Sequence, residues 1–149
     1  MDSEIRYVAA TGALGVGVHV ESLEKSLEIE PAFIAADAGT TDAGPFSLGM
    51  GVPAFAREAV KRDLTALLSV TRKAKIPALI GSAGTAGGDP HVDWVLDIAR
   101  EIVREQGHYF AYRGHPFRAK QGLSFAALSG RTYSRPGPGA AAKRTDLRA

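Results

Sequence analysis

The chain has 149 residues, of which 45% are hydrophobic and 23% charged, and it contains no cysteine. This length fits one ordinary domain with a core of its own. The lack of cysteine excludes disulfides, zinc–thiolate sites and cysteine nucleophiles. The start lacks the continuous apolar segment of a signal peptide, and no stretch approaches the roughly 18 apolar residues of a membrane span. We therefore expect a soluble cytoplasmic protein with no membrane partner.

The net charge of +2 hides an asymmetry along the chain. Residues 1–114 carry 11 Lys/Arg and 15 Asp/Glu, which gives −4, whereas residues 115–149 carry 7 Lys/Arg and the single acid Asp146, which gives +6. Such a break indicates two segments of different origin or role. We expect an α/β ligand-binding domain over 1–114 and a basic tail, rich in Pro, Gly and Ala, over 115–149.

The first half of the domain alternates strand and helix patterns. Residues 5–12 (IRYVAATG) read as a buried strand that ends in the glycine-rich turn GALGVGV. A short helix follows, with Val20, Leu23 and Leu27 at helical spacing and Pro31 closing it. FIAAD is a second strand, apolar on both faces, as is typical of parallel strands covered by helices on both sides.

The second half repeats this alternation. After a loop over 39–53, residues 54–75 predict the longest helix, with an apolar stripe and a basic C-terminus. IPALIGSAG (76–84) predicts a third strand. Residues 89–107 predict a helix with Asp89 as N-cap, Pro90 as first helical residue and Gly107 as the stop signal. HYFAYRG (108–114) predicts a fourth strand.

This order predicts an α/β fold with right-handed, Rossmann-like βαβ crossovers and a parallel sheet, incomplete in this chain. In such sheets ligands bind outside the carboxyl ends of the strands. Three predicted strands end in polar, glycine-rich loops, TGALGVG, DAGTTDAG and GSAGTAGGDP. We expect these loops to converge on one pocket. An exposed sheet edge, expected if further strands are absent, would favour self-association.

The first and third loops are candidate binding loops. TGALGVG has the spacing G-x-x-G-x-G instead of the dinucleotide fingerprint G-x-G-x-x-G, so Thr11 and Gly12 are expected to border a ligand without specifying a nicotinamide or flavin. GSAGTAGGDP lacks the lysine of a Walker loop but precedes a helix, where an anion is stabilised. Its alternative role is a tight turn. The residues concerned are Ser82, Gly84, Gly87, Gly88 and Asp89.

The second loop carries the candidate catalytic groups. Asp37, Asp42 and His91 are candidate acid–base residues, and with Asp89 and Asp93 they could form a cluster for a hard divalent cation. The alternatives are that Asp37 binds neighbouring loop amides and that His91 is solvated. Gly39, Thr40 and Thr41 could contact a ligand oxygen or satisfy their own loop. The motifs assign neither a cofactor nor a metal.

Four longer runs occur in order over about residues 5–114: TGALGVG, AADAGTTDAGPFSLGMG, REAVKRDL and LIGSAGTAGGDPHVDW. This set resembles the acyclic terpene utilisation (AtuA-type) family, whose members are considerably longer. The resemblance implies a catabolic protein for branched, terpenoid or related acids, handled as acyl-CoA intermediates. It transfers no assigned catalytic residue. The matched positions are Asp37, Gly39, Thr40, Thr41, Asp42, Gly44, Pro45, Ser82, Gly84, Gly87, Gly88, Asp89 and His91.

The resemblance stops at residue 114, where a family member would continue with a run like IHSEQ-K-YL-RRL. Read from the second base of the His115 codon, codons for this tail can spell IHSEQSKDYLLRRL. Our hypothesis is that a single-base shift near Gly114 puts the tail out of frame, which leaves it disordered or poorly packed. Resequencing the gene tests this: an uninterrupted frame, with homologous tails, would remove the hypothesis.

Three functions compete. The first is the ligand-binding half of a catabolic enzyme for an acidic or acyl-CoA-type metabolite, inactive alone if downstream sequence is missing. The second is a non-catalytic metabolite- or nucleotide-binding module that works with a partner subunit. The third is a nucleic-acid-binding arm formed by the tail, with salt-dependent affinity. Sparse aromatic residues and the lack of a motif argue against the third, so no nucleic-acid partner is expected.

Overall fold

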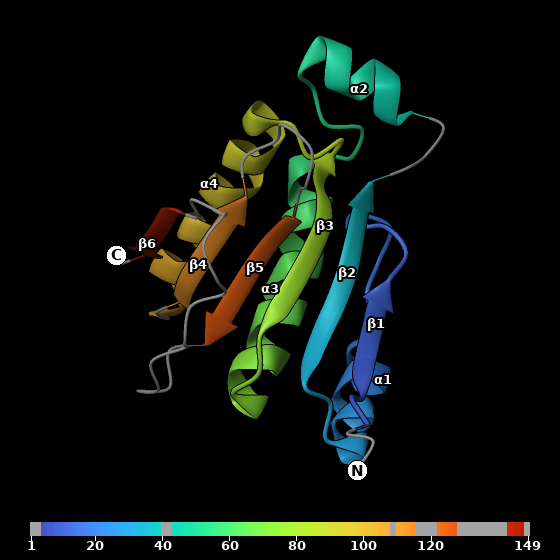
Figure 1. The fold of residues 1–149 in the computed structure, drawn as a ribbon, viewed down its shortest axis with the longest axis vertical. Coiled ribbons are helices and arrows are strands. Elements are labelled where there is room, and N and C mark those ends of the chain that lie inside the picture. The colour runs from blue at the N-terminus through green and yellow to red at the C-terminus, as the bar shows by residue number, and fades with distance from the viewer. Residues whose placement is uncertain (1–3, 40–42, 108–109, 116–121, 128–142, 148–149) are drawn as a thin grey trace.

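The computed structural model describes residues 4–39, 43–107, 110–115, 122–127 and 143–147. Strands and helices alternate along the first three quarters of the chain (Figure 1), which confirms the predicted α/β class with βαβ crossovers. The elements are β1 (Tyr7–Thr11), α1 (Val20–Lys25) with the 3-10 turn η1 (Ser26–Ile29), β2 (Phe33–Gly39), α2 (Gly44–Met50), α3 (Arg57–Ala74), β3 (Ala78–Thr85), α4 (Asp89–Gln106), β4 (Phe110–His115), β5 (Gly122–Ala127) and β6 (Lys143–Leu147).

The sheet has the order β1-β2-β3-β5-β4-β6. As predicted, β1, β2 and β3 are parallel neighbours. β4 is the predicted fourth strand, but it does not pair with β3. Instead β5 lies between them, antiparallel to both, and β6 pairs antiparallel with β4. The sequence analysis missed β5 and β6, while the rest of the tail expected to be poorly packed (116–121, 128–142 and 148–149) lies outside the described residues.

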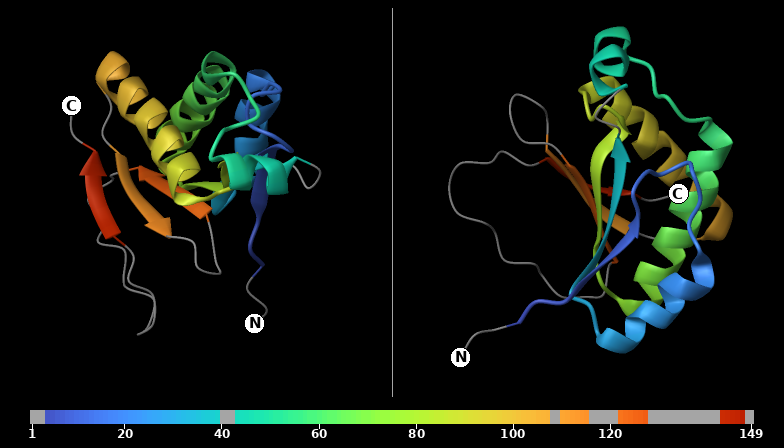
Figure 2. Two further views of the ribbon diagram at one scale, coloured as in Figure 1. Left: turned by 90° about the horizontal axis from the view of Figure 1, so that it is seen from above. Right: turned by 90° about the vertical axis from the view of Figure 1, so that its right-hand side faces the viewer.

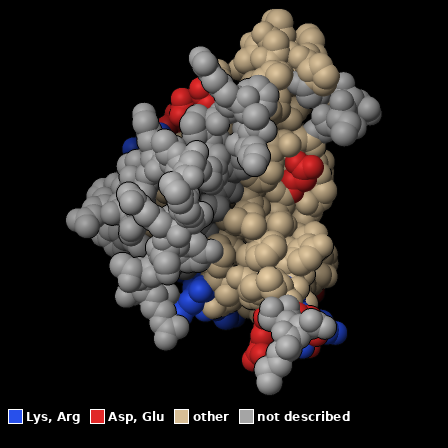
Figure 3. Space-filling model, in the orientation of Figure 1, with Lys and Arg blue, Asp and Glu red and all other residues tan. Residues whose placement is uncertain are grey.

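The described helices α1, α3 and α4 all cover the same face of the sheet (Figures 1 and 2). The expectation that β2 is covered on both sides is therefore wrong for the described residues. On the open face, the rings of Tyr7 and Phe33 stack at 5.3 Å, and Tyr7 is 61% exposed. Figure 3 shows that the part of this face not covered by grey atoms is largely free of charge.

The core lies between the sheet and the helices. Residues at helical spacing turn one face of α3 and one face of α4 toward the strands, as an amphipathic stripe requires. The buried apolar residues of these helices and of the central strands include Ile34, Val60, Leu64, Leu67, Leu68, Ile80, Val95, Leu96, Ile98, Ile102 and Val103. None of the described helices is both long and apolar enough to cross a membrane.

The loop predicted over 39–53 contains a helix, α2, that the sequence analysis missed. Pro45 lies in its first turn, where a proline needs no amide partner, and Gly51 ends it in the left-handed region at φ 67°. The sequence did not predict this helix because its seven residues include two glycines and show only weak helical periodicity. It projects beyond the carboxyl ends of β2 and β3 (Figure 1).

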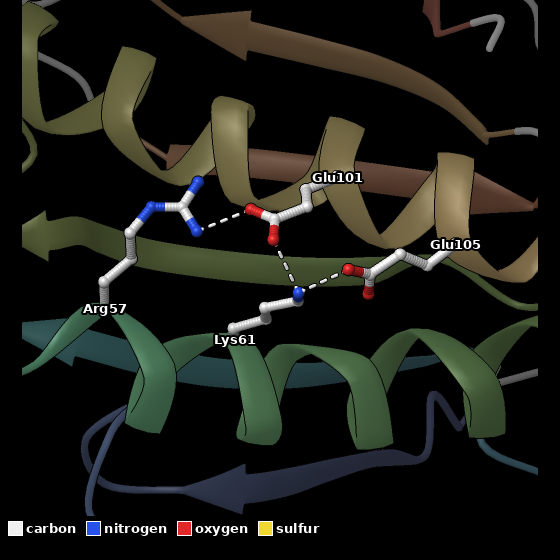
Figure 4. Close-up of polar contacts among 4 residues, drawn as sticks. All are labelled: Arg57, Lys61, Glu101 and Glu105. Atoms are coloured by element: carbon white, nitrogen blue, oxygen red, sulfur yellow. Dashed lines mark hydrogen bonds and ion pairs between the residues drawn. The ribbon is translucent and has the colours of Figure 1, made fainter.

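A network of ion pairs joins α3 to α4 (Figure 4). The Glu101 carboxylate accepts hydrogen bonds from Arg57 and Lys61, each at 2.6 Å, and Lys61 also donates to Glu105 at 2.7 Å. The Lys61 and Arg57 hydrogen bonds lower the pKa of Glu101, and those from Lys61 to Glu101 and Glu105 raise the pKa of Lys61. These ion pairs, in which Glu101 and Lys61 each have two partners, link α3 to α4.

Glu101→Gln is expected to lower the free energy of unfolding at neutral pH. The lowered pKa of Glu101 makes its contribution present above the ordinary carboxyl pKa, and the contribution fades as the pH falls through the lowered value. Urea unfolding at pH 7 and about pH 3 measures this difference. Asp97→Asn is the matched control, because Asp97 forms an exposed pair with Arg100 on the same helix. An equal loss in both variants, or one that does not shrink in acid, would contradict the expectation.

Candidate functional site at the carboxyl ends of the parallel strands

Parallel pairing brings the loops after β1, β2 and β3 to one edge of the sheet. Gly39 is opposite Thr85, so β2 and β3 end at the same height, whereas β1 ends at Thr11, opposite Ala36 and three residues before the end of β2. The Leu14 amide also donates to the Asp37 carbonyl at 2.8 Å, which ties the first loop to the end of the second strand. The described parts of the predicted loops therefore share one rim of the molecule.

The glycine-rich loop after β1 is held from within the protein. One carboxylate oxygen of Asp63, on α3, accepts the amides of Gly15 at 2.9 Å and Gly17 at 2.8 Å. Asp63 is 1% exposed, and its other oxygen pairs with Arg62 at 2.8 Å. Two amides that could have bound a ligand anion are thus occupied by an internal carboxylate.

Thr11 and Gly12, the predicted ligand-bordering residues of this loop, differ in availability. The Thr11 hydroxyl exchanges hydrogen bonds with the backbone of Ala13 at 3.2 and 3.3 Å, so it stabilises its own turn. Gly12 is exposed, and a Cβ added there would meet no heavy atom within 4 Å. Of the two, Gly12 leaves open space in which a ligand could approach the backbone.

The end of β2 shows the local role that was the alternative for Asp37. Its exposed carboxylate accepts the amide of Gly39 at 2.9 Å. Gly39 has a packing reason for being glycine, since a Cβ there would lie 2.4 Å from the Ser82 Cβ and 2.7 Å from the Thr85 carbonyl. The bond to Gly39 uses Oδ1 and fixes the Asp37 side chain at the end of β2, beside β3. Thr40, Thr41 and Asp42 lie outside the described residues.

The turn between β3 and α4 is conformationally strained. Ser82 has φ 46° and Thr85 has φ 87°, and the second value is unusual for a β-branched residue. The buried Thr85 hydroxyl accepts the Ala54 amide at 2.8 Å, which holds this backbone in place. Such strain costs about 1–3 kcal/mol per residue and clusters at functional sites.

His91, in the first turn of α4, is 1% exposed, so the alternative that it is solvated is wrong. Its Nε2 lies 3.1 Å from the Ser47 carbonyl of α2. Because a carbonyl oxygen only accepts, Nε2 must carry a proton in this contact. The buried Nδ1 has no hydrogen-bond partner among the described residues. In neutral His91, Nδ1 therefore presents a free lone pair.

The first turn of α4 corrects the predicted cap. Gly88, not Asp89, is the N-cap, and no side chain caps the helix. Asp89 is instead the first helical residue and is exposed. The glycines of this turn pack closely: a Cβ on Gly84 would lie 2.7 Å from the His91 carbonyl, and Gly87 bonds back to Ala83 at 2.9 Å. Gly84 therefore serves close packing against His91 and its positive φ of 64°, and Gly87 serves its positive φ of 67°.

The predicted metal cluster is not found among the described residues. No group of three or more His, Asp or Glu side chains within them could hold an ion. His91 is buried, whereas Asp37, Asp89 and Asp93 are exposed. The cluster hypothesis keeps one untested member, Asp42, which lies outside the described part of the chain. Acid–base roles for Asp37 and His91 do not depend on a metal.

A narrow hollow lies behind the three loops. Its walls come from the first loop, the end of β2, the segment before α3, the β3–α4 turn and α4, and it is too narrow for a water molecule. The residues that line it are Leu14, Ala38, Pro53, Phe55, Val60, Gly84, Thr85 and Trp94. This hollow is a gap in apolar packing beneath the rim, so a ligand would bind above it.

Sequence reasoning missed three residues of this rim: Asp63, Thr85 and Ser47. Asp63 had a detectable signal, because an acid interrupts the apolar stripe between Val60 and Leu64 and must find a buried partner. Thr85 and Ser47 gave no comparable signal, since threonine and serine in polar loops are common. Comparisons with models of protein families, with curated proteins and with solved structures found no match.

Asp63→Ala is expected to lower the free energy of unfolding by about 1–3 kcal/mol, because the Gly15 and Gly17 amides would lose their shared acceptor. Urea unfolding gives the stability, and hydrogen exchange of these two amides reports the loop directly. Asp97→Asn is the control: both side chains of its pair with Arg100 are exposed, so its loss should change stability by less than about 1 kcal/mol. Unchanged exchange at Gly15 and Gly17 in Asp63→Ala would contradict the proposed role.

Proposed function

We propose that this chain is the N-terminal ligand-binding part of a catabolic enzyme that acts on branched or terpenoid acids or their acyl-CoA thioesters. The motif resemblance to the AtuA-type family suggests the substrate class. We expect the ligand to bind at the rim formed by the loops after β1, β2 and β3. We also expect that this chain alone binds its ligand but does not turn it over.

The observation that carries the proposal is the surface of α2 beside this rim. The helix has no charged residue, and Phe46 is 67% and Met50 62% exposed. Leu48 and Val52 are also exposed. Exposed apolar groups gathered beside a polar rim mark a binding surface. A ligand with an apolar, branched chain and an acidic head would contact both parts.

The rim offers candidate groups for both ends of such a ligand. Gly12 leaves its backbone open, and the β3–α4 turn offers the positive end of the α4 dipole to the acidic head. His91 and Asp37 are the described candidates for moving a proton, and Asp42 is the third. His91 is the stronger of the two described residues, because its Nδ1 has no competing partner.

The alternative is a non-catalytic metabolite- or nucleotide-binding module that works with a partner subunit. One observation favours it: the Nδ1 atom of His91, a candidate acid–base group, is buried. The sheet face that none of the described helices covers also offers a surface for a partner. Both proposals share the same ligand rim and differ in whether the bound ligand is turned over.

Titration of the ¹⁵N-labelled chain with a branched-chain acyl-CoA and its free acid tests the proposal. We expect amide shifts in residues 11–17, 37–39 and 82–91, and in α2. Asp37→Asn keeps an acceptor for the Gly39 amide and removes a negative charge that would repel the acidic head, so binding should tighten severalfold. Asp97→Asn, exposed and paired with Arg100 on α4, is the control and should bind normally.

Turnover of the same compounds, measured with this chain and with a longer protein that carries the same motifs, separates the two functions. Turnover by the longer protein that is lost in its counterpart of Asp42→Ala favours the enzyme. Weakened binding with unchanged turnover favours the module. Amide shifts confined to the open sheet face, or no binding by either compound, would remove the proposed ligand rim.

A further inference from the structure

The buried imidazole of His91 lies against the N-terminus of α4, an 18-residue helix. Gly88 is the N-cap, and a Cβ built on it would lie 3.2 Å from the Nδ1 atom. Nδ1 is therefore next to the point where the helix leaves backbone N–H groups unsatisfied, and no side chain caps them. An unpartnered polar atom that is buried at such a place needs a ligand to satisfy it.

We propose that the β3–α4 turn binds an oxyanion, a carboxylate or phosphate group, with doubly protonated His91 as its counter-ion. In this state Nε2–H donates to the Ser47 carbonyl, as it does already, and Nδ1–H donates to an anion oxygen. In the first turn of α4, Pro90 has no N–H and the His91 amide already donates to the Gly88 carbonyl at 2.9 Å, so the Asp89 amide and the α4 dipole would add to the attraction. The inference rests on the proposed function in taking this oxyanion as the acidic head of the ligand.

The contact with the Ser47 carbonyl determines how many protons the His91 ring carries with and without the anion. Since the Ser47 carbonyl can only accept, its hydrogen bond requires a proton on Nε2 in both the neutral and the doubly protonated ring. An anion oxygen at Nδ1 also accepts, so the ring must gain a second proton when the anion arrives. Binding therefore takes up a proton wherever the free protein has neutral His91. A ligand hydroxyl could use the neutral ring instead, and would then bind without proton uptake.

The surroundings of His91 contain few other titratable groups. Among the described residues, α2 and β3 carry none. On β2, Asp37 lies at the level of Gly81, and on α4, Asp89 and Asp93 are exposed beside the first turn. All three are acids, which favour the charged ring but oppose the anion. Asp89 is the nearest to the helix start, so it limits the affinity.

Leu48 covers the approach to Nδ1. Its Cδ1 would lie 3.1 Å from a Cβ on Gly88, yet the residue is 44% exposed. A rotation of this side chain would let an oxygen reach the Nδ1 atom while Ser47 keeps its contact with Nε2. The ligand's apolar part would then lie along α2, where Leu48 and Met50 are exposed. One helix thus borders both the acidic head and the apolar chain.

Sulfate and acetate are the probes, because both keep a constant charge between about pH 5.5 and 8, where histidine side chains change theirs. Amide shifts should centre on Gly87, Gly88 and Asp89, and affinity should fall by up to about tenfold per pH unit as the pH rises. Proton uptake, read from calorimetry in buffers of different ionisation enthalpy, should accompany binding and grow toward one as the pH rises. Preference for sulfate identifies a phosphate site, and preference for acetate a carboxylate site.

Two substitutions at His91 test the roles of its two ring nitrogens separately. His91→Gln keeps a donor for Ser47 in place of Nε2 and removes the Nδ1 group, so anion binding and its pH dependence should be lost in a folded protein. His91→Asn keeps a polar group near the Nδ1 position and removes the link to α2, so part of the binding should remain. Asp89→Asn, outside the core, should tighten binding severalfold and keeps the test decisive if both His91 variants unfold.

Binding of neither probe, shifts centred elsewhere, or an affinity independent of pH would overturn the inference. So would equal affinity in wild type and folded His91→Gln. These outcomes are separate from those for the proposed function. If the acyl-CoA binds at the rim without proton uptake, the oxyanion site at His91 fails and the proposed function stands. If sulfate or acetate binds as expected but no acyl-CoA or branched acid does, the ligand class fails instead.

Discussion

Parallel pairing of β1, β2 and β3 decides where every loop of functional interest lies. Because the strands run in the same direction, their carboxyl ends and the loops that follow them are placed on one rim. The helices between the strands return the chain along the covered face, and their apolar stripes provide the core. Any change that shifts these strands by one position would move the rim residues apart and turn the apolar residues away from the helices.

Much of this arrangement could be predicted from residue patterns. The alternation of short apolar runs with helical stripes predicted three parallel strands, α3, α4 and β4, because burial of apolar side chains imposes those periods. The loop rim followed from the shared direction of the strands. The patterns failed for α2, where glycine weakens the helical signal, and at Asp89, where Gly88 caps the helix instead. They also could not place β5, whose position depends on pairing between distant segments.

The details of the rim depended on contacts between residues far apart in the sequence. The sequence named His91 and Asp37, but it could not show that His91 is buried against α2 or that Asp37 caps the Gly39 amide. Nor could spacing show that Asp63 accepts the Gly15 and Gly17 amides from 48 and 46 residues away. Together these contacts divide the rim: its first loop is satisfied internally, whereas the third keeps an unpartnered nitrogen. An external ligand has more to gain at the third loop.

The place of β5 in the sheet has a consequence for how the chain folds. The β3–α4–β4 connection leaves a gap one strand wide, and residues 122–127 fill it. During synthesis on the ribosome, the backbone N–H and C=O groups along one edge of β3 would lack strand partners until residues 122–127 emerge. Pairings that close long chain loops form slowly. In that interval another extended peptide could pair with this edge of β3. Early chaperone contact, or a strand donated by a second molecule, would then compete with the pairing of β5.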